Sequence, residues 1–535
     1  MSSKSLCFLS LVSSIINTPL LCNSLIHGHG SHLPLPPRHP YHPPNFSPAP
    51  TIPKPKPSPV TPSFPVIGHL QLLSPLLHRS IHHLSKDHGP IFLLRLGSVP
   101  AIFLSSAELA KEAIKTREID FATRPPSSVV DRLGYGTQDV AFAPYGPYWR
   151  RARSACVLHL LSPRRVRAFG SVREEEVALL LSAVRAAGPS PVNLSAMLIG
   201  VTNDIICRVA LGRKYRPRGR DLGEMLKEMG ACLHAFPMKD FVPWLGWVDR
   251  ITGFNARVER CFEMFDEFLE EVLEDHLVGR GSDRAAENAD FVDVLLSLKE
   301  QDEKDGGFDL GRDSLKAIIV DMFVAGTDTI LNTLEWTMAE LVRHPVAMRR
   351  ATEEVRRRRP DVKEEKSVDQ TTDYLNAVVK ETLRLHPPFP MLVPRAARRD
   401  TELSGYKVPA NTTVFINAWA IARDPEYWKR PEEFWPERFL DDGCGGGVDY
   451  RGQCFHFIPF GAGRRSCPGI EFSLVTITCV MENLLRWFDW EPAEERKEDV
   501  LDMTECRDIN VHKKFPLILT AKPWIEDSYA PMPQL

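Results

Sequence analysis

The sequence predicts a mainly α-helical protein with a minor β-sheet region. Several long segments repeat apolar residues at helical spacing, and the longest runs from Asp313 to Pro345. Only two stretches, 89–106 and 405–423, have the β-branched and aromatic character of strands. The 535 residues, 43% hydrophobic and 25% charged, also have the ordinary composition of a globular chain.

In chain order, the first predicted element is a pair of short strands within 89–106, joined by a Gly-Ser turn. Helical patterns follow it. The segment 279–312 is charged and contains glycine, so we expect a solvated loop there. The segment 405–423, "GYKVPANTTVFINAWAIAR", returns to strand character. The predicted helices are "SAELAKEAIKT", "VREEEVALLLSAVRAA", "VERCFEMFDEFLEEVLEDHL" and the long run that begins at Asp313.

The N-terminus differs in composition from the rest of the chain. Ser5 to Ile26 carries no charge over 22 residues, long enough to span a bilayer, although several of its residues are polar. Pro34 to Pro65 contains 14 prolines in 32 residues, which predicts a stiff, extended linker. We therefore expect a marginal membrane anchor over 1–30, a linker over 31–63 and one large domain over 64–535. The alternative for the first segment is a cleaved targeting peptide, because acid-free, serine-rich N-termini also suit organelle import.

Charge and cysteine content exclude several classes of protein. The 66 basic and 69 acidic residues give a net charge of −3, so no nucleic acid is expected as a partner. The 11 cysteines are scattered without CxxC pairs, which argues against a disulfide-rich scaffold or a zinc ribbon. Most of them are expected to be small buried residues.

Cys467, in "FIPFGAGRRSCPGIEFSLVTITC", is the exception. Pro468 follows it and opens an apolar helical pattern, so backbone N–H groups and the helix dipole are expected to stabilise a thiolate. Neighbouring glycines leave room for a large flat partner, and neighbouring arginines suit an anionic one. These glycines and arginines are Gly461, Gly463, Gly469, Arg464 and Arg465.

This loop resembles the heme-binding loop of the cytochrome P-450 superfamily, and the resemblance extends over roughly Phe64 to Trp524. It implies the cytochrome P-450 fold, with a single large heme domain. Cys467 would then be the axial thiolate ligand of heme b, iron protoporphyrin IX. The loop positions that carry the resemblance, and that would hold the cofactor, are Phe460, Gly463, Arg465, Cys467 and Gly469.

Two further motifs support the resemblance. The resemblance implies that Trp149 and Arg153, one helical turn apart, reach a heme propionate with help from Arg465 and from Arg395 of "VPRAARRD". It also implies a structural cluster behind the heme loop. That cluster would join Glu381 and Arg384 of "ETLR" with Arg438 of "PERF".

The motif Ala325-Gly-Thr-Asp328-Thr329 lies midway along the long apolar run. By resemblance it forms an oxygen-binding groove, in which the Thr329 hydroxyl steadies the oxygen that is being activated and Asp328 supplies protons through water. A structural kink, caused by a threonine that bonds to its own helix backbone, is the alternative. Ile330 stands where relatives commonly carry Thr or Ser, which leaves the details of water access open.

Several sequences, among them "FAPYGPYWRRAR" and "FVPWLGWVDRITGF", are similar to those of plant A-type members near family seventy-one, although the N-terminus is less apolar than is usual there. The resemblance implies a largely apolar substrate pocket that includes Phe323, Ala325, Phe389, Met391 and Leu392. It draws this pocket from the stretches 127–140, 236–254, 322–325, 389–393 and 506–511.

We therefore expect a monooxygenase that inserts one atom of O2 into a lipophilic plant specialised metabolite. Electrons would come from NADPH through cytochrome P-450 reductase, with cytochrome b5 as a further partner. The alternative is a heme-thiolate dehydratase or isomerase, for example one acting on an aldoxime, or a non-enzymatic heme-binding protein. The expected location is the endoplasmic reticulum membrane with the heme domain in the cytosol, and the alternative is the plastid. A basic docking patch of Arg150, Arg151 and Arg464 would face the reductase.

Overall fold

The computed structural model describes residues 63–64, 66–215, 222–279, 289–305, 310–358, 373–440, 447–493, 501–507 and 509–524. The predicted anchor (1–30) and most of the predicted linker (31–63) lie outside these residues.

The prediction of a mainly α protein is confirmed. Helices cover most of the described chain, and the strands are short. The α-helices are α2 (Leu77–His88), α3 (Ala107–Lys111), α4 (Ser128–Leu133), α5 (Pro147–Ala155), α6 (Pro163–Ala168), α7 (Gly170–Ala186), α8 (Leu194–Leu211), α9 (Leu222–Leu233), α10 (Met238–Phe241), α11 (Trp247–Ile251), α12 (Phe254–Gly279), α13 (Phe291–Asp305), α14 (Arg312–Arg343), α15 (Pro345–Arg357), α16 (Asp373–Leu385), α17 (Ala418–Ile421) and α18 (Ile470–Trp487).

The strands form three small sheets. The largest has the order β1-β2-β7-β4, in which only the β2–β7 pair is parallel. A second sheet has the order β3-β9-β8, and β5 pairs with β6 alone. The strands are β1 (Ile91–Leu96), β2 (Val99–Leu104), β3 (Val192–Asn193), β4 (Arg395–Ala396), β5 (Thr401–Leu403), β6 (Tyr406–Val408), β7 (Thr413–Ile416), β8 (Phe488–Pro492) and β9 (Ile518–Pro523).

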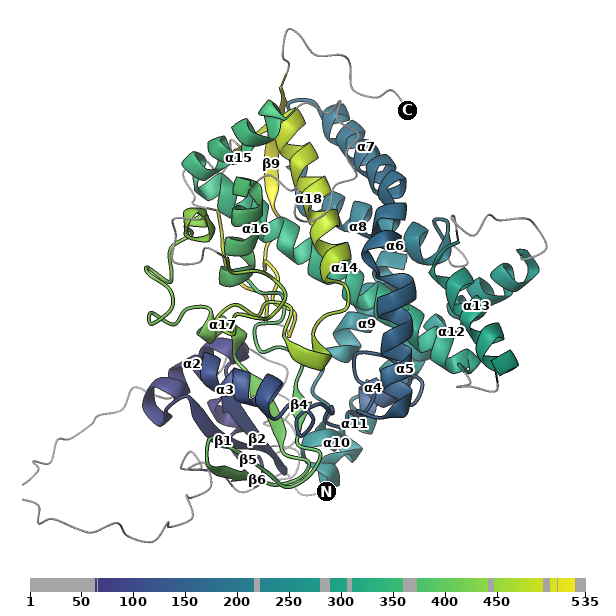
Figure 1. Ribbon diagram of the computed structural model, residues 1–535, viewed down its shortest axis with the longest axis vertical. Helices are drawn as coiled ribbons and strands as arrows, with labels where there is room; N and C mark the ends of the chain where they lie inside the picture. The colour runs from purple at the N-terminus through teal and green to yellow at the C-terminus, as the bar shows by residue number, and fades with distance from the viewer. Residues whose placement is uncertain are drawn as a thin grey trace, which may run out of the picture. The chain divides into compact units, whose positions relative to one another are not determined.

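The predicted hairpin is confirmed as β1 and β2. Its turn needs glycine, because Gly97 has a φ of +61° and a side chain there would meet the Phe241 carbonyl oxygen at 2.3 Å. Buried residues of β1 and β2 stack their rings, with 5.7 Å between the centroids of Phe92 and Phe103. Figure 1 shows this hairpin with α2 beside it, and α2 packs on β1.

Helix α14 is the long helix that the sequence predicts. It ends at Arg343 because Pro345 disfavours helical geometry at the preceding residue, and His344 accordingly has φ −120° and ψ 78°. Figure 1 shows α14 beside α8, α16 and α18, and it packs on all three. This helix therefore connects the parts of the fold that carry the predicted catalytic and cofactor motifs.

Two local predictions were wrong. The segment 279–312 is not simply a solvated loop, because its described part contains α13, whose apolar residues Phe291, Val292, Leu295 and Leu296 are at most 5% exposed. These residues recur on one helical face, and the surrounding charges concealed that pattern. The end of 405–423 forms α17, which begins because the Asn417 side chain accepts a hydrogen bond from the Ala420 N–H at 3.1 Å.

Among the described residues, α8 and α14 are long and apolar enough to cross a membrane. More than half of each apolar window is buried inside the protein. Both helices are therefore core helices of the domain.

Candidate cofactor-binding and catalytic site

Cys467 lies in a tight loop before α18. Its N–H donates to the Phe460 carbonyl oxygen at 2.9 Å, and the Gly469 N–H donates to the Cys467 Sγ at 3.3 Å. The helix itself begins at Ile470, so Pro468 is not its first residue as the sequence suggested. The sulfur therefore meets one loop N–H rather than the open end of a helix.

Burial opposes the thiolate that the helix terminus was expected to favour. Cys467 keeps some accessible surface, yet the surrounding protein desolvates it closely, and this burial raises the pKa of the thiol. The Gly469 N–H and the Arg153 charge oppose the rise without cancelling it. A bound metal ion would displace the thiol proton, because coordination couples to deprotonation. Cys467 is therefore a thiolate when iron is bound to its sulfur.

The loop glycines act mainly on backbone geometry and packing. Gly461 and Gly463 have φ values of +68° and +67°, which residues with a side chain rarely adopt. A side chain at Gly463 would meet both the Ile114 carbonyl oxygen and the Glu118 Oε1 at 2.8 Å. The space left at Gly463 is therefore filled by the neighbouring protein segment. Phe460 stands edge-on to Tyr450, with 6.0 Å between the ring centroids.

Helix α5 is tied directly to this loop. The Trp149 Nε1–H donates to the Val140 carbonyl oxygen at 2.9 Å, and the Arg465 guanidinium lies 4.0 Å from the centre of the Trp149 ring. Arg153, one turn further along, donates to the Ser466 carbonyl oxygen at 2.6 Å. The structure therefore brings the two predicted cofactor residues of α5 next to the two residues that precede Cys467.

Four arginines lie near the Cys467 loop, namely Arg124, Arg153, Arg395 and Arg465. Arg395 donates to the Ala462 carbonyl oxygen at 3.2 Å, and Arg465 donates to the Ala122 carbonyl oxygen at 2.7 Å. Burial, with the positive charge of Arg395 and Arg153, lowers the pKa of Arg465 to about 9, and burial lowers that of Arg395 to about 10. Guanidinium groups keep their proton in proteins, so these shifts describe the electrostatic cost of gathering buried cations.

Arg124 is the member of this cluster that the sequence reasoning missed. It donates to the Ala141 carbonyl oxygen at 2.8 Å and to the Val393 carbonyl oxygen at 2.7 Å. Burial and the charges of Arg465 and Arg395 hold its pKa well below the usual range. Its sequence context, "FATRPP", does not indicate that Arg124 lies near the Cys467 loop. A cluster of buried cations fits a flat cofactor that carries carboxylates, as the two propionates of heme do.

The predicted structural cluster is formed. The Glu381 carboxylate accepts from the Arg384 Nε at 2.7 Å and the Arg438 Nε at 3.0 Å, and all three side chains are 0% exposed. Both arginines also donate to backbone carbonyls between residues 422 and 433. The cluster therefore holds the irregular segment before the Cys467 loop against α16.

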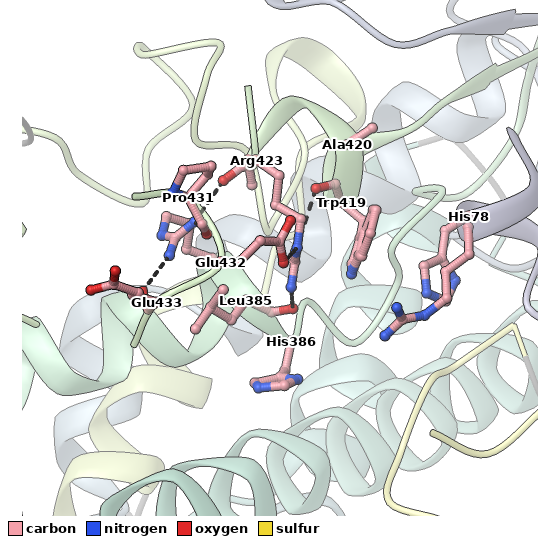
Figure 2. Close-up of polar contacts among 12 residues, drawn as sticks. His78, Leu385, His386, Trp419, Ala420, Arg423, Pro431, Glu432 and Glu433 are labelled. Atoms are coloured by element: carbon pink, nitrogen blue, oxygen red, sulfur yellow. Dashed lines mark hydrogen bonds and ion pairs between the residues drawn. The ribbon is translucent and has the colours of Figure 1, made fainter. Parts of the chain in front are cut away.

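Arg423 extends this support. It donates to the Leu385 carbonyl oxygen at 2.8 Å, pairs with Glu432 at 3.1 Å and lies 4.0 Å from the centre of the Trp419 ring. Figure 2 shows Arg423 between these partners, with the Leu385 carbonyl below it and Trp419 to one side. The end of α16 and the segment 419–432 are therefore fixed to each other.

The oxygen-binding motif lies in the middle of α14. Ala325 is exposed although Phe323 and Thr327 beside it are buried, so open space adjoins this turn of the helix. The Thr329 Oγ1–H donates to the Ala325 carbonyl oxygen at 2.6 Å, which is the backbone bond of the kink alternative. A side chain at Gly326 would meet Ile206 of α8 at 2.6 Å, so this glycine allows α8 to approach closely.

The five predicted pocket residues occupy different surroundings. Ala325 and Phe389 keep accessible surface. Phe323 is buried and stands edge-on to Phe268 of α12, with 6.4 Å between the centroids. Met391 belongs to the hydrophobic cluster under β1 and β2, and Leu392 belongs to the cluster that includes β7. The structure thus places Ala325 and Phe389 at accessible positions and the other three in core packing.

One loop next to the arginines is held by an acid that sequence reasoning missed. The Asp321 Oδ2 on α14 accepts from the Val140 N–H at 2.6 Å and the Ala141 N–H at 3.2 Å. Burial and the nearby charge of Asp139 raise the pKa of Asp321 well above its usual range. The Val140 carbonyl oxygen accepts from Trp149, and the Ala141 carbonyl oxygen accepts from Arg124. Asp321 therefore fixes the loop whose carbonyl groups bind these two side chains.

Comparison with known proteins agrees with this geometry. The family model described as Cytochrome P450 matches residues 57–516. Cytochrome P450 736A117 of Prunus mume is 45% identical over 87% of this chain and 90% of the relative. Cytochrome P450 71A1 of Persea americana is 46% identical over 85% and 91%, and norfluorocurarine oxidase of a Strychnos species is 43% identical over 86% and 91%.

Solved structures show the same fold. A zebrafish cytochrome P450 with progesterone has a TM-score of 0.68 and 26% identity, and the match covers 84% of this chain and 99% of that one. The matched chain includes Cys467, the arginine cluster and α14. The chain therefore belongs to the cytochrome P450 family and is a plant member close to family 71.

Proposed function

We propose that this cytochrome P450 monooxygenase inserts one atom of O2 into a lipophilic plant specialised metabolite, with NADPH-derived electrons delivered by cytochrome P-450 reductase. The observation that carries the proposal is on α14. Ala325 is exposed between the buried residues Phe323 and Thr327, and Asp328 and Thr329, both partly exposed, follow three and four residues after it. An acid and an alcohol therefore adjoin open space, as proton delivery to a bound oxygen molecule requires.

Heme supplies the one-electron and oxygen chemistry when it is bound, with the Cys467 thiolate as its iron ligand. We assign Arg153, Arg395 and Arg465 to its carboxylates, because these side chains surround the Cys467 loop. The single N–H of Trp149 donates to the Val140 carbonyl oxygen, so Trp149 supports this group through its ring, which lies 4.0 Å from the Arg465 guanidinium. The Gly469 N–H at 3.3 Å would donate to the thiolate and moderate its basicity.

The Thr329 hydroxyl would hold and pass a proton at its Oγ1. In this structure its hydrogen points to the Ala325 carbonyl oxygen at 2.6 Å, so the oxygen of the hydroxyl remains able to accept. The Asp328 carboxyl lies beside α9, because a Cβ at Gly230 would be 3.6 Å from the Asp328 Oδ2. We infer that Asp328 exchanges protons with water and Thr329 relays them.

The compounds named for the related proteins support a lipophilic substrate. One of them is named norfluorocurarine oxidase, and the zebrafish structures contain progesterone or abiraterone. For this chain we infer an apolar small molecule seated near Ala325 and Phe389. A screen of lipophilic plant metabolites by difference spectroscopy would identify compounds that displace the water on iron.

A dehydratase, an isomerase or a heme-binding protein without oxygen chemistry remains the alternative. Turnover of a screened compound should require both NADPH and O2, and one oxygen atom of the product should come from O2. Product formed without either reagent would reject the monooxygenase assignment for that compound. The acid–alcohol pair favours oxygen chemistry, because the alternatives have no need for proton delivery to oxygen.

We further infer that the heme domain contacts the endoplasmic reticulum membrane from the cytosol. Large apolar side chains are exposed at the start of the described domain and between α9 and α12, which suits a membrane surface. These residues are Phe64, Val66, Phe236, Trp244, Trp247 and Ile251. Deletion of residues 1–60 should leave heme binding intact and release protein from microsomes. Import of the full chain into plastids would favour the targeting-peptide alternative.

We also propose that Arg150 and Arg151 of α5 form a docking surface for an acidic reductase. Both are exposed on the helix that carries Trp149. Arg464, the third predicted member, pairs with Glu118 at 2.8 Å, so its charge is compensated. Charge reversal at Arg150 and Arg151 should raise the apparent KM for reductase, and added salt should slow reductase-driven turnover more than peroxide-driven turnover. Equal salt sensitivity would reject this docking surface.

A further inference from the structure

Asn332 of α14 is a buried amide with an unusual set of partners. It is 1% exposed, and its Nδ2 donates to the Asn510 Oδ1 at 2.6 Å and to the Val511 carbonyl oxygen at 3.1 Å. Its own Oδ1 has no hydrogen-bond partner within the part of the chain that the structure describes. The amide orientation is fixed, because a flipped Asn332 would set its oxygen against two acceptors.

The next turns of α14 hold neighbouring groups on the same face. The Trp336 Nε1–H donates to the Val511 carbonyl oxygen at 3.4 Å, and the Trp336 ring stacks on His386 with 4.1 Å between the centroids. The Glu340 Oε1 then contacts the His386 Nε2 at 2.7 Å. Positions 332, 336 and 340 are four residues apart, so they form one stripe along the helix.

The two segments held by this stripe are joined to each other. The Val511 N–H donates to the Pro388 carbonyl oxygen at 2.9 Å. Phe389, which keeps accessible surface, directly follows Pro388. Residues 388–389 and 510–511 therefore form one continuous structure, which we call the wall.

The same stripe begins with the acid–alcohol pair. Thr329 precedes Asn332 by three residues, which corresponds to about 4.5 Å along the helix axis and to the same side of the helix. Asn332 therefore bonds residues 510 and 511 to α14 about one helical turn beyond Thr329.

We propose that Asn332 is a positioning residue that fixes the wall against α14 and thereby determines which bulky ligands fit beside the heme iron. This rests on the proposed function in one respect, that the substrate space adjoins Ala325 and Phe389. A purely structural amide would stabilise the fold without affecting discrimination between ligands. Asn332 instead directs both of its N–H donors to residues 510 and 511, which are part of the wall.

Asn332→Asp provides the sharpest test, because it keeps the size of the side chain and removes both donors. The carboxylate would face the Asn510 Oδ1 and the Val511 carbonyl oxygen, so the loop should move away. Asn483→Asp is the matched control, since the Asn483 Nδ2 also donates to a backbone carbonyl, that of Cys479 at 2.8 Å, but on α18. Both variants are made in the full chain loaded with heme.

Two measurements are needed. The first is spectral titration with imidazole and with 4-phenylimidazole, both of which bind heme iron and differ only in a phenyl ring, so that 4-phenylimidazole is the bulkier ligand. In Asn332→Asp, the Kd for 4-phenylimidazole should rise roughly tenfold relative to that for imidazole, which corresponds to about 1.4 kcal/mol. The second is hydrogen–deuterium exchange, in which the peptide containing Val511 should exchange about tenfold faster or more. Asn483→Asp should change neither result.

Faster exchange with an unchanged ratio of Kd values would show a merely structural role and overturn the proposal, as would unchanged exchange. If Asn332→Asp does not retain heme, the comparison is made with Asn332→Ser, which keeps one donor and should give a smaller shift in both measurements. No shift in the ratio for Asn332→Ser would also overturn the proposal. Neither measurement depends on turnover, so a failure of the monooxygenase assignment would be recognised separately.

Discussion

Replacing Glu381 by glutamine should destabilise the protein severely. The Glu381 carboxylate accepts from Arg384 at 2.7 and 2.9 Å, from Arg438 at 3.0 Å and from the Trp435 N–H at 2.8 Å. The side chains of Glu381 and the two arginines are 0% exposed. Glu381→Gln keeps the size of the side chain and removes the negative charge. Its new NH2 group would also face guanidinium donors.

The size of the effect follows from this burial. Removing one partner of a buried ion pair costs about 3–5 kcal/mol, because the remaining charge is left uncompensated. Here two arginines lose the same counter-charge, although each keeps backbone carbonyl acceptors such as those of Pro431 and Lys429. We therefore expect a loss of about 4 kcal/mol in the free energy of unfolding. Native stabilities are only about 5–15 kcal/mol, so much of the protein should fail to accumulate with heme.

The assay is thermal unfolding together with the carbon-monoxide difference spectrum of the reduced protein. Glu433→Gln is the control, because its pair with Arg430 at 2.9 Å is more than half exposed on both sides. An exposed pair contributes at most about 1 kcal/mol. Glu381→Gln should lower the Tm by roughly 4 °C and reduce the heme content, while the control should resemble the unmodified protein. Equal Tm values for the two variants would refute the reasoning.

Three further outcomes are expected. Cys467→Ala should lose the carbon-monoxide absorption of a thiolate-ligated heme, and a retained band would exclude Cys467 as the ligand. Asp328→Asn and Thr329→Ala should keep heme but lower product formed per NADPH by up to about 10²-fold, with peroxide released, and full coupling in both would support the kink alternative. Burial raises the pKa of Glu505, but His78 and Arg79 lower it further, to about 2 from 4.5. This carboxylate therefore contributes stability above pH 4.5 that is lost as the pH falls toward 2, on the order of 2–3 kcal/mol, and Glu505→Gln should flatten that part of the curve of unfolding free energy against pH.

Several features could be predicted from the sequence because they depend on local pattern. The hairpin of β1 and β2 was predicted by β-branched and aromatic runs around Gly97, and α14 by an uninterrupted apolar pattern that stops before Pro345. Cys467 was identified because its neighbours at fixed spacing are unusual for an ordinary buried thiol. In these cases the signal lies within about thirty consecutive residues.

Predictions were incomplete in two situations. In one, charged residues concealed an apolar helix face, and in the other, burial opposed the effect expected from neighbouring residues in the sequence. Helix α13 was missed because its four buried apolar residues are surrounded by Asp, Glu and Lys. The thiolate of Cys467 was attributed to a helix terminus, yet α18 begins three residues later and burial raises the pKa of the thiol, so the thiolate depends on the bound metal ion instead. Desolvation depends on neighbours from distant segments, which a local pattern does not contain.

The sequence by itself determined the family and the pairing of Glu381 with Arg384, and it predicted the thiol ligand and the acid–alcohol pair. Each of these is a short motif with side chains on one helix turn or loop. Only the tertiary structure decided which other residues meet them. Arg124, Asp321 and Asn332 lie far in sequence from the groups that they contact, and their partners are mostly backbone carbonyl and N–H groups. Every residue has such groups, so the sequence carries no trace of these contacts until the chain has folded.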